Sequence, residues 1–423
     1  MKTTKKLSLI LCAIVVTCVF LFAGCSPLFI NDFFFTKYSQ ETPTNETISI
    51  ETEGLTKEER KTQIAQQYIN ISFTVIISKK VEAKVYSALG TEISSSENET
   101  FSSFGSGTIV HKGGYILTNY HVVKDALSEP LKASSTNRYT GEITKTTTTY
   151  IVYVSQDGGE NCHRASILWT GLNFDLAIIQ CNEFASLNAA PMKDRSVYCA
   201  EADRIKVLEE VITVGTQYSQ ENYGSATTGT ISSALVRSIY GSELQLNYEY
   251  LIQHNASINH GNSGGALIDL DGYLIGVNTL GVDNAHSLFY AASIYPVMLV
   301  LDYVVENWEQ NAATTIDVSF GLSAIDKLMV DNAPNGMIES KYENYNENGV
   351  KVILVEDNCI INGIELDDII VEIKFSGLNN EEVFKINNVY DFLYARLRLH
   401  EYNSATVKVL RNGVEQILTL TKG

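Results

Sequence analysis

The chain has 423 residues, of which 45% are hydrophobic, and it carries a formal net charge of −18. This length exceeds one ordinary core, so we expect two or three domains. The acidic balance repels phosphate backbones, which argues against nucleic-acid binding. The cysteines show no CxxC pair and no Cys/His spacing typical of zinc.

The N-terminus carries a targeting signal. Lys2, Lys5 and Lys6 precede an apolar run of about 17 residues that ends in "LFAGC". This ending resembles the lipobox of bacterial lipoproteins, so residues 1–24 are predicted to be a signal peptide and Cys25 the lipidated residue. An uncleaved anchor helix is the alternative. In both cases the folded part faces outward, held at the cell membrane.

Three further regions follow the signal. Residues 25–67 are polar and predict a flexible tether. Residues 68–312 contain many short β-branched runs divided by turn residues, which predict an all-β barrel or sandwich, and then the helical run "PVMLVLDYVVENWEQN". The Thr-rich stretch "TNRYTGEITKTTTTY" predicts an exposed loop or hairpin. Residues 313–423 mix strands and one helix and predict a second, α+β domain.

Four cysteines remain in the predicted mature domains. Cys162 and Cys181 flank the predicted turn "TGLN", so they could face each other and form a disulfide. Free buried thiols are the equal alternative for this pair. Nothing in the sequence assigns a partner to Cys199 or Cys359.

Three polar residues with catalytic chemistry each lie at the end of a predicted strand. His121 follows "GYILTNY", Asp175 precedes "LAIIQ", and Ser263 lies in "NHGNSGGA". A serine hydroxyl needs a base within hydrogen-bond reach, and His121 can take that proton and return it to a leaving amine. Asp175 would fix the imidazole tautomer and stabilise its charge. Because this set supplies its own nucleophile and base, the sequence predicts no metal and no cofactor.

The glycines around Ser263 predict a tight turn that binds an anion. Gly261, Asn262 and Ser263 form the predicted oxyanion hole, in which the N–H groups of Gly261 and Ser263 face the developing charge. Such donors typically lower a barrier by about 3–4 kcal/mol. Gly264 and Gly265 leave room for the turn's dihedral angles and for a substrate chain.

At these residues the chain resembles the HtrA family, which consists of trypsin-like serine proteases followed by PDZ domains. The matching pieces are "GSGTIVHKGGYILTNYHVV", "FDLAII", "VITVGTQ", "TTGTISSALVR" and "ASINHGNSGGALIDLDGYLIGVNT". The resemblance implies a mostly β fold, a chymotrypsin-like double β-barrel followed by an α+β PDZ domain. It also implies a homotrimer. The family typically has proline where this chain has His260 and Ala266, and these changes leave the three catalytic positions unaltered.

The resemblance also implies where substrate binds. Ser257 takes the position at the base of the S1 pocket, with Ile258 beside it, and neither side chain is acidic. We therefore expect small or medium apolar side chains, rather than Arg or Lys, before the cleaved bond. The stretch "LFYAAS" resembles the strand that pairs with the substrate backbone, which assigns this role to Tyr290 and Ala291. Binding by strand addition suits unfolded targets.

The C-terminal domain resembles a PDZ domain. The stretch "SFGL", with Ser319, Phe320, Gly321 and Leu322, matches the loop that binds a peptide's carboxylate. Asp367 replaces a glycine that the family usually has, and the segment after Asp331 is long and polar. A PDZ-like domain that has lost peptide binding is the alternative.

The sequence leads to a membrane-tethered, ATP-independent serine endopeptidase that cleaves misfolded extracytoplasmic proteins. The alternative is an idle protease domain that acts as a chaperone or as a peptide-binding adaptor through its PDZ domain. A solute-binding lipoprotein would alternate strands and helices, which this sequence does not do.

Overall fold

The computed structural model describes residues 46–420 of the chain, with gaps. The gaps are residues 52, 194–204, 242–245, 282–286, 308–319, 321, 328–344, 346, 358, 378–380, 400–401 and 403. The predicted signal peptide and Cys25 therefore lie outside the described residues, as do Ser319, Gly321 and Cys199. Among the helices of the described residues, none is long and apolar enough to cross a membrane.

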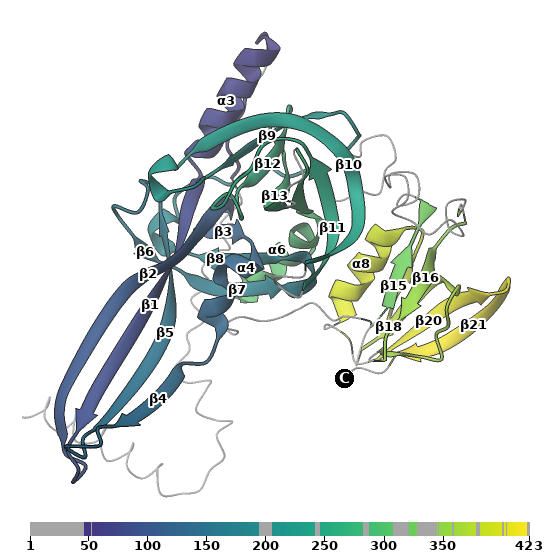
Figure 1. Cartoon of the computed structure of the whole chain (residues 1–423). Coiled ribbons are helices and arrows are strands. Elements are labelled where there is room, and N and C mark those ends of the chain that lie inside the picture. Colours follow the sequence, from purple (N-terminus) through teal and green to yellow (C-terminus); the bar gives the residue numbers. More distant parts are fainter. Residues whose placement is uncertain are drawn as a thin grey trace, which may run out of the picture. The chain divides into compact units, whose positions relative to one another are not determined.

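The first half of the folded chain is an eight-stranded antiparallel sheet, with strands in the order β4-β5-β1-β2-β3-β8-β7 and β6 paired with β5 (Figure 1). Its strands are β1 (Ser72–Tyr86), β2 (Glu92–His111), β3 (Tyr115–Thr118), β4 (Leu131–Thr136), β5 (Ile143–Ser155), β6 (His163–Arg164), β7 (Ser166–Gly171) and β8 (Leu176–Gln180). Thr118, at the end of β3, lies opposite Ala177, at the start of β8. The segments that follow β3 and precede β8 therefore meet at one end of the sheet.

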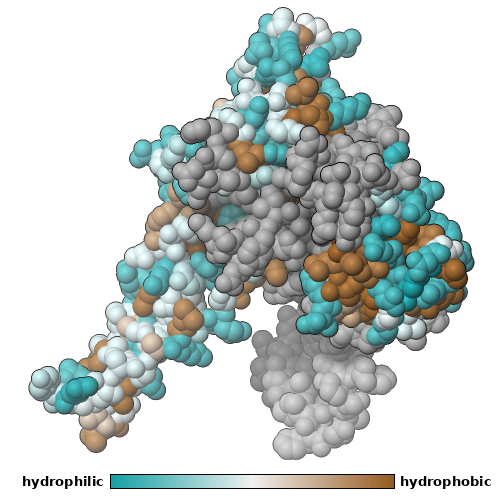
Figure 2. Space-filling model, turned by 45° about the vertical axis from the view of Figure 1, so that its right-hand side comes forward, coloured by the Kyte–Doolittle hydropathy of each residue, from teal (hydrophilic) through white to brown (hydrophobic). Residues whose placement is uncertain are grey.

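Part of this sheet extends from the body as a ribbon made of the outer parts of β1, β2 and β5 together with β4 (Figure 1). In the ribbon, β1 lies between β2 and β5, from Lys79 to Tyr86. Lys80 forms ion pairs with Glu82 and Glu97 on one of its faces. The Thr-rich stretch forms the β4–β5 hairpin, one of the two forms expected for it. Figure 2 shows the ribbon as a narrow projection with a mostly hydrophilic surface.

The second half is a closed antiparallel barrel of six strands in the order β10-β11-β14-β13-β12-β9. Its strands are β9 (Glu210–Gly215), β10 (Ser225–Gly241), β11 (Leu246–His254), β12 (Ala266–Asp269), β13 (Leu274–Gly281) and β14 (Phe289–Ser293). Val211, Ile231, Ile252, Leu267 and Ile275 pack together as one of its buried clusters. The sheet and the barrel confirm the mostly β fold expected from the sequence.

A helix occupies the last part of the region expected to be a flexible tether. α3 (Lys57–Ile69) begins with a capping box between Thr56 and Glu59, and it buries Ile64 and Tyr68. The Tyr68 hydroxyl donates to the Gly272 carbonyl at 2.9 Å. The prediction of a tether through residue 67 is therefore wrong for its last part. Capping and two apolar anchors stabilise this helix despite its polar composition.

The expected helix after the barrel is present as α6 (Tyr295–Asn307). Short helices connect the strands of the first two regions: α4 (Tyr120–Val123), η2 (Lys124–Leu127), η3 (Leu172–Phe174), η4 (Asn182–Phe184) and η5 (Gln220–Asn222). Among the described cysteines, Cys162, Cys181 and Cys359 are free. The predicted disulfide between Cys162 and Cys181 is therefore absent, and the alternative of free buried thiols holds for Cys181, whereas Cys162 is free but exposed.

The C-terminal region has an antiparallel sheet in the order β15-β16-β18-β20-β21-β17, with β19 also paired to β18. Its elements are β15 (Leu322–Ile325), β16 (Val350–Val355), β17 (Ile361–Asn362), β18 (Ile369–Ser376), β19 (Glu381–Lys385), α8 (Val389–Arg398), β20 (Ser404–Arg411) and β21 (Val414–Leu420). Asn388 caps α8 by accepting from the backbone N–H groups of Tyr390 and Asp391. This region has the α+β composition expected from the sequence.

Candidate active site

His121 and Asp175 meet at the end of the first sheet. His121 lies in α4, directly after β3, and Asp175 lies between η3 and β8. His121 Nδ1 is 2.8 Å from Asp175 Oδ2, and the His121 backbone N–H donates to Oδ1 at 3.0 Å. The Asp175 side chain is fully buried, whereas 19% of the His121 side chain is exposed. A carboxylate at Nδ1 holds the proton there, so Nε2 can accept a proton as a base.

The conformation of Asp175 depends on its neighbours. Its backbone is left-handed, with φ 51° and ψ 44°, a region that Asp tolerates better than most residues. Asn119 Nδ2 donates to the Asp175 carbonyl at 2.7 Å. Thr279, on β13 of the barrel, donates its hydroxyl to Asp175 Oδ2 in a short hydrogen bond. The buried carboxylate therefore has donors from both the sheet and the barrel.

Ser263 lies in the turn between β11 and β12, close to the same threonine. The Ser263 hydroxyl donates to the Thr279 carbonyl at 3.1 Å. Thr279 thus contacts Asp175 through its side chain and Ser263 through its backbone, which brings the three predicted catalytic residues into one small region. Within the described residues, Ser263 makes no hydrogen bond to His121. A serine has one hydroxyl proton, so the hydroxyl must rotate away from Thr279 before it can donate to the imidazole.

The turn around Ser263 requires its glycines. Gly261 has φ 89° and Gly264 has φ 91°, both in the left-handed region. A Cβ on Gly264 would lie 1.9 Å from the Ser106 carbonyl oxygen. The Ser106 N–H donates to the Ser263 carbonyl at 2.7 Å. Close backbone approach, and not only turn geometry, therefore explains this glycine.

The backbone donors of the turn divide into two groups. The Asn262 N–H donates to the Asn259 carbonyl at 3.0 Å, so it is not free to bind an oxyanion. In the part of the chain that is described, the N–H groups of Gly261 and Ser263 have no protein acceptor. The His260 carbonyl accepts from the Tyr218 N–H at 2.7 Å. Because a trans peptide directs C=O and N–H oppositely, the Gly261 N–H points away from Tyr218.

The predicted pairing of substrate with Tyr290 and Ala291 is wrong. β14 is hydrogen-bonded on both sides, to β11 and to β13, and both residues are buried. In the closed barrel, the backbone N–H and C=O groups of β14 are already paired with β11 and β13 and cannot bind a substrate. On β13, by contrast, β12 pairs only as far as Val277. The backbone from Thr279 to Gly281 therefore offers an edge beside Ser263.

The two predicted S1 residues lie on the segment between β11 and the serine turn. Ser257 is exposed, and its carbonyl accepts from the Thr227 hydroxyl at 2.7 Å. Ile258 is buried, with 8% of its surface exposed. Neither Ser257 nor Ile258 carries a negative charge. These two residues therefore provide no carboxylate that would select an Arg or Lys side chain of the substrate.

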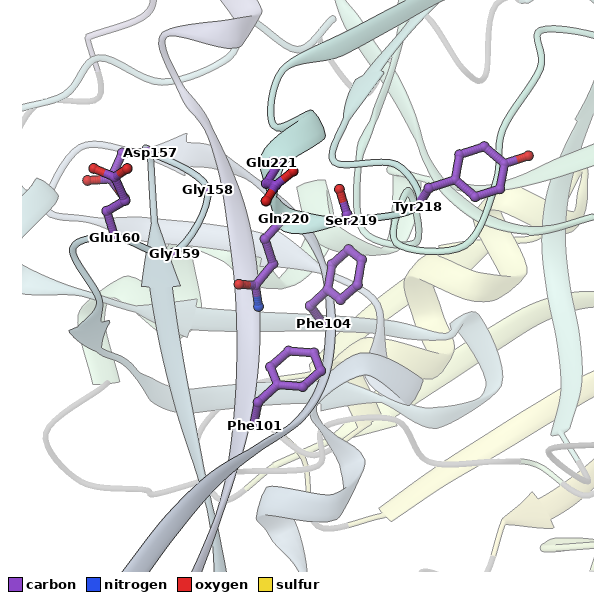
Figure 3. A pocket seen from close by; sticks show the side chains of 10 residues that line it. All are labelled: Phe101, Phe104, Asp157, Gly158, Gly159, Glu160, Tyr218, Ser219, Gln220 and Glu221. Carbon is purple, nitrogen blue, oxygen red and sulfur yellow. The ribbon is translucent and has the colours of Figure 1, made fainter.

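A cleft of about 790 Å³ lies at the base of the ribbon (Figure 3). Its lining residues are Phe101, Phe104, Asp157, Gly158, Gly159, Glu160, Tyr218, Ser219, Gln220 and Glu221. Two phenylalanine rings and three carboxylates contribute to it, and no Lys or Arg does. Figure 3 shows the rings of Phe101 and Phe104 near Gln220, while Tyr218 points away from them. The Phe104 ring packs on Gly261, where a Cβ would lie 2.3 Å from Cε2, so the cleft adjoins the serine turn.

The described part of the predicted carboxylate-binding loop lies beside an edge strand. Phe320 is buried, and its ring lies 5.4 Å from that of Phe392 on α8. Leu322 begins β15, which among the described strands pairs only with β16 and so forms an edge of the described sheet. An edge strand beside a helix is the arrangement that binds a peptide by strand addition.

The sequence reasoning missed Thr279. The signal was present, because Thr279 ends the stretch "YLIGVNT", a strand that comes soon after Ser263 in the sequence. A threonine in a half-buried strand is common, however, so its role appears only when the barrel brings it to Asp175. The described residues contain no cluster of three or more His, Cys, Asp or Glu side chains that could hold a metal ion.

Part of the chain is similar to the trypsin-like serine peptidases. Residues 105–277 match the family described as "Trypsin-like peptidase domain". The chain is 34% identical over 197 residues to "Probable periplasmic serine endoprotease DegP-like" of Buchnera aphidicola subsp. Baizongia pistaciae, covering 46% of this chain and 34% of that protein. It is 32% identical over 184 residues to "Periplasmic serine endoprotease DegP" of Escherichia coli K12, covering 43% and 31%.

A relative from Bacillus subtilis matches over a longer stretch. The chain is 28% identical over 354 residues to "Serine protease Do-like HtrB" of Bacillus subtilis, covering 78% of this chain and 68% of that protein. The crystal structure of the serine endoprotease from Yersinia pestis is similar with a TM-score of 0.44 and 20% identity, covering 85% of this chain and 96% of that one. The match to the periplasmic relatives spans about a third of their length.

Proposed function

We propose that the chain is an HtrA-type serine endopeptidase that cleaves unfolded or misfolded polypeptides outside the cytoplasm. The observation that carries the proposal is the His121–Asp175 pair at 2.8 Å, joined to Ser263 through Thr279. A buried carboxylate behind an imidazole and a serine in a glycine turn form the arrangement that activates a hydroxyl for acyl transfer.

The reaction uses only groups of the chain and water. Ser263 Oγ attacks the carbonyl carbon of the scissile peptide bond while His121 Nε2 takes the hydroxyl proton. The N–H groups of Gly261 and Ser263 bind the oxygen that becomes negative. The C–N bond then breaks, the imidazolium gives its proton to the leaving amine, and an ester to Ser263 remains. His121 next activates a water molecule, which hydrolyses the ester and restores the serine.

Substrate binding and release of the nucleophile are coupled in this proposal. The Thr279 carbonyl accepts from the Ser263 hydroxyl, and it lies on the free edge beside the serine. A substrate N–H that pairs with this carbonyl would compete with the hydroxyl for it. The displaced hydroxyl could then turn to His121. Pairing by strand addition requires an extended chain, which unfolded proteins provide.

The remaining parts of the proposal come from the sequence and the relatives. The Buchnera and E. coli relatives are described as periplasmic serine endoproteases, which supports an extracytoplasmic site of action. We place the chain at the membrane surface through a lipid on Cys25. A PDZ-type domain at residues 313–423, with its edge strand β15, would bind peptide C-termini, and assembly as a trimer follows the family pattern.

Casein digestion tests the proposed function. Wild-type protein should digest casein, and Ser263→Ala and His121→Ala should each lose digestion while melting at the wild-type temperature. Mapped cut sites should follow small or medium apolar residues, because no carboxylate lies at Ser257 or Ile258. Digestion that survives in Ser263→Ala would refute the mechanism, and cuts mainly after Lys or Arg would refute the assignment of the S1 pocket.

The hydrogen bond between Ser263 and Thr279 also favours a second candidate, a protease domain that is idle and serves as a chaperone or adaptor. In that case the hydroxyl stays on the Thr279 carbonyl when substrate is bound. A fluorophosphonate probe distinguishes the candidates. The peptidase predicts labelling of wild type that disappears in Ser263→Ala, and the adaptor predicts no labelling of a folded protein that still suppresses aggregation of an unfolded client.

A further inference from the structure

Ser106 connects three segments at the junction of the sheet and the barrel. It lies on β2 and is fully buried. Its hydroxyl accepts from the Thr216 N–H at 2.8 Å and donates to the Gly261 carbonyl at 2.7 Å. Its backbone N–H donates to the Ser263 carbonyl at 2.7 Å. One residue of the sheet thus holds the carbonyls on both sides of Asn262.

The hydroxyl's two hydrogen bonds have a fixed direction. A backbone N–H can only donate, so Thr216 takes a lone pair of the Ser106 oxygen. The single hydroxyl proton is then directed at the Gly261 carbonyl, which can only accept. Neighbouring hydrogen bonds of this kind polarise and strengthen each other. The Gly261 carbonyl is therefore held in one orientation.

Gly261 needs this support more than other residues do. Its φ of 89° lies in a region open to glycine, and a glycine resists rotation about its own bonds less than any other residue. The peptide before Gly261 is held at its carbonyl, and the peptide after it is held at its carbonyl and at the Asn262 N–H, which donates to the Asn259 carbonyl at 3.0 Å. The Tyr218 N–H holds the His260 carbonyl, and the Ser106 hydroxyl holds the Gly261 carbonyl. Together these contacts fix both dihedral angles and thereby the direction of the Gly261 N–H.

We propose that Ser106 is a positioning residue that keeps the Gly261 N–H directed at the oxyanion. The inference rests on the proposed peptidase function and adds a residue that does not touch the substrate. Without the hydroxyl, the Gly261 carbonyl loses its partner in a buried site, and only the Asn262 N–H still holds that peptide, which can then tilt. The Gly261 N–H is then no longer directed at the oxyanion of the transition state. The surfaces that bind the substrate in the ground state stay unchanged.

Ser106→Ala tests the proposal, and Ser72→Ala is its matched control. Ser72 is equally buried, and its hydroxyl donates to the Tyr68 carbonyl at 2.7 Å, away from the serine turn. We expect Ser106→Ala to lower kcat by about 10- to 100-fold with little change in KM, which is less than the 10²- to 10³-fold loss typical of deleting a donor. Ser72→Ala should keep wild-type kcat.

A tetrahedral inhibitor separates positioning from general damage. A peptide boronate forms a tetrahedral adduct with the serine and places an oxygen in the oxyanion hole, so its affinity should fall by the same factor as kcat/KM. Binding of an uncleaved peptide, measured in the Ser263→Ala background, should be the same with and without Ser106→Ala. A loss of peptide binding equal to the loss of boronate binding would overturn the proposal.

Folding of the variant is checked by thermal melting. If Ser106→Ala does not fold, Ser106→Cys preserves the side-chain size with a weaker donor and should show the same split between kcat and KM. Wild-type kcat in a folded Ser106→Ala or Ser106→Cys variant would refute the positioning role. Casein digestion that persists in Ser263→Ala would instead refute the underlying peptidase function, so the two failures are distinguishable.

Discussion

Replacing Asp175 by asparagine changes the proton on His121 rather than the shape of the site. The carboxylate accepts from the His121 backbone N–H, from His121 Nδ1 and from the Thr279 hydroxyl. An asparagine offers one acceptor oxygen and one NH₂ group. If the oxygen keeps the backbone N–H, the NH₂ group faces Nδ1, and the imidazole must move its proton to Nε2 to avoid opposing donors.

The expected loss is large because a protonated Nε2 cannot act as a base. The same exchange in a Ser-His-Asp triad typically lowers kcat by about 10⁴. At about 1.36 kcal/mol for each factor of ten, this corresponds to about 5 kcal/mol of transition-state stabilisation. The opposite placement of the amide would set NH₂ against the His121 backbone N–H in a fully buried site, so it gives no escape.

Turnover of an internally quenched peptide measures the effect, with thermal melting to show that the variant is folded. The rate of fluorophosphonate labelling should fall in parallel, because the same base activates Ser263. A folded Asp175→Asn variant that keeps turnover and labelling within about tenfold of wild type would show that Asp175 does not control the imidazole proton.

Three further changes follow from the contacts. Gly264→Ala should abolish casein digestion, because its Cβ would lie 1.9 Å from the Ser106 carbonyl at φ 91°; normal digestion would contradict the packing of the turn. Arg411→Met should lower the urea midpoint for unfolding of the C-terminal region, because it leaves the buried Asp368 carboxylate without its paired hydrogen bonds at 2.7 and 2.8 Å; an unchanged midpoint would refute this. Burial lowers the pKa of His254 from 6.5 to about 4. The unfolded chain then binds more protons between those values, so this group's contribution of about 3 kcal/mol is lost as pH falls from 6.5 to 4. Urea unfolding at pH 5 and pH 7 should show a smaller pH dependence in His254→Phe, and an equal dependence would refute the assignment.

The structure brings the three predicted catalytic positions into one region, and each of them has a local signal in the sequence. Ser263 has glycines on both sides, and His121 and Asp175 each adjoin a strand whose apolar run is legible in the sequence. The strand order brings them together, since Thr118 pairs with Ala177. The sequence of a strand does not, however, specify which other strands pair with it. Tyr290 resembled a substrate-pairing residue, but the closing barrel leaves it between two strands.

Two other differences have physical reasons. The outer part of β2, residues 92–103, is exposed throughout and polar except for Ile93 and Phe101, so it shows no alternation of apolar residues and gives no strand signal. It is a strand because β1 supplies a full partner. The polar composition of α3 led to the prediction of a tether, although the sequence contains a capping residue, Thr56, and two residues that the helix buries, Ile64 and Tyr68. Tertiary contact decided both cases.

The ribbon has a consequence for how stability is distributed along β1. Its inner end, from Ser72 to Ile77, is buried, while its outer end has no side chain sheltered from water to the same degree. Local opening costs little where few apolar contacts are lost, so the outer ladder should open far more often than the inner one. Amide hydrogen exchange would then slow steadily from the turn at Ser87 toward Ile77, because the strands of the ribbon separate first at its tip.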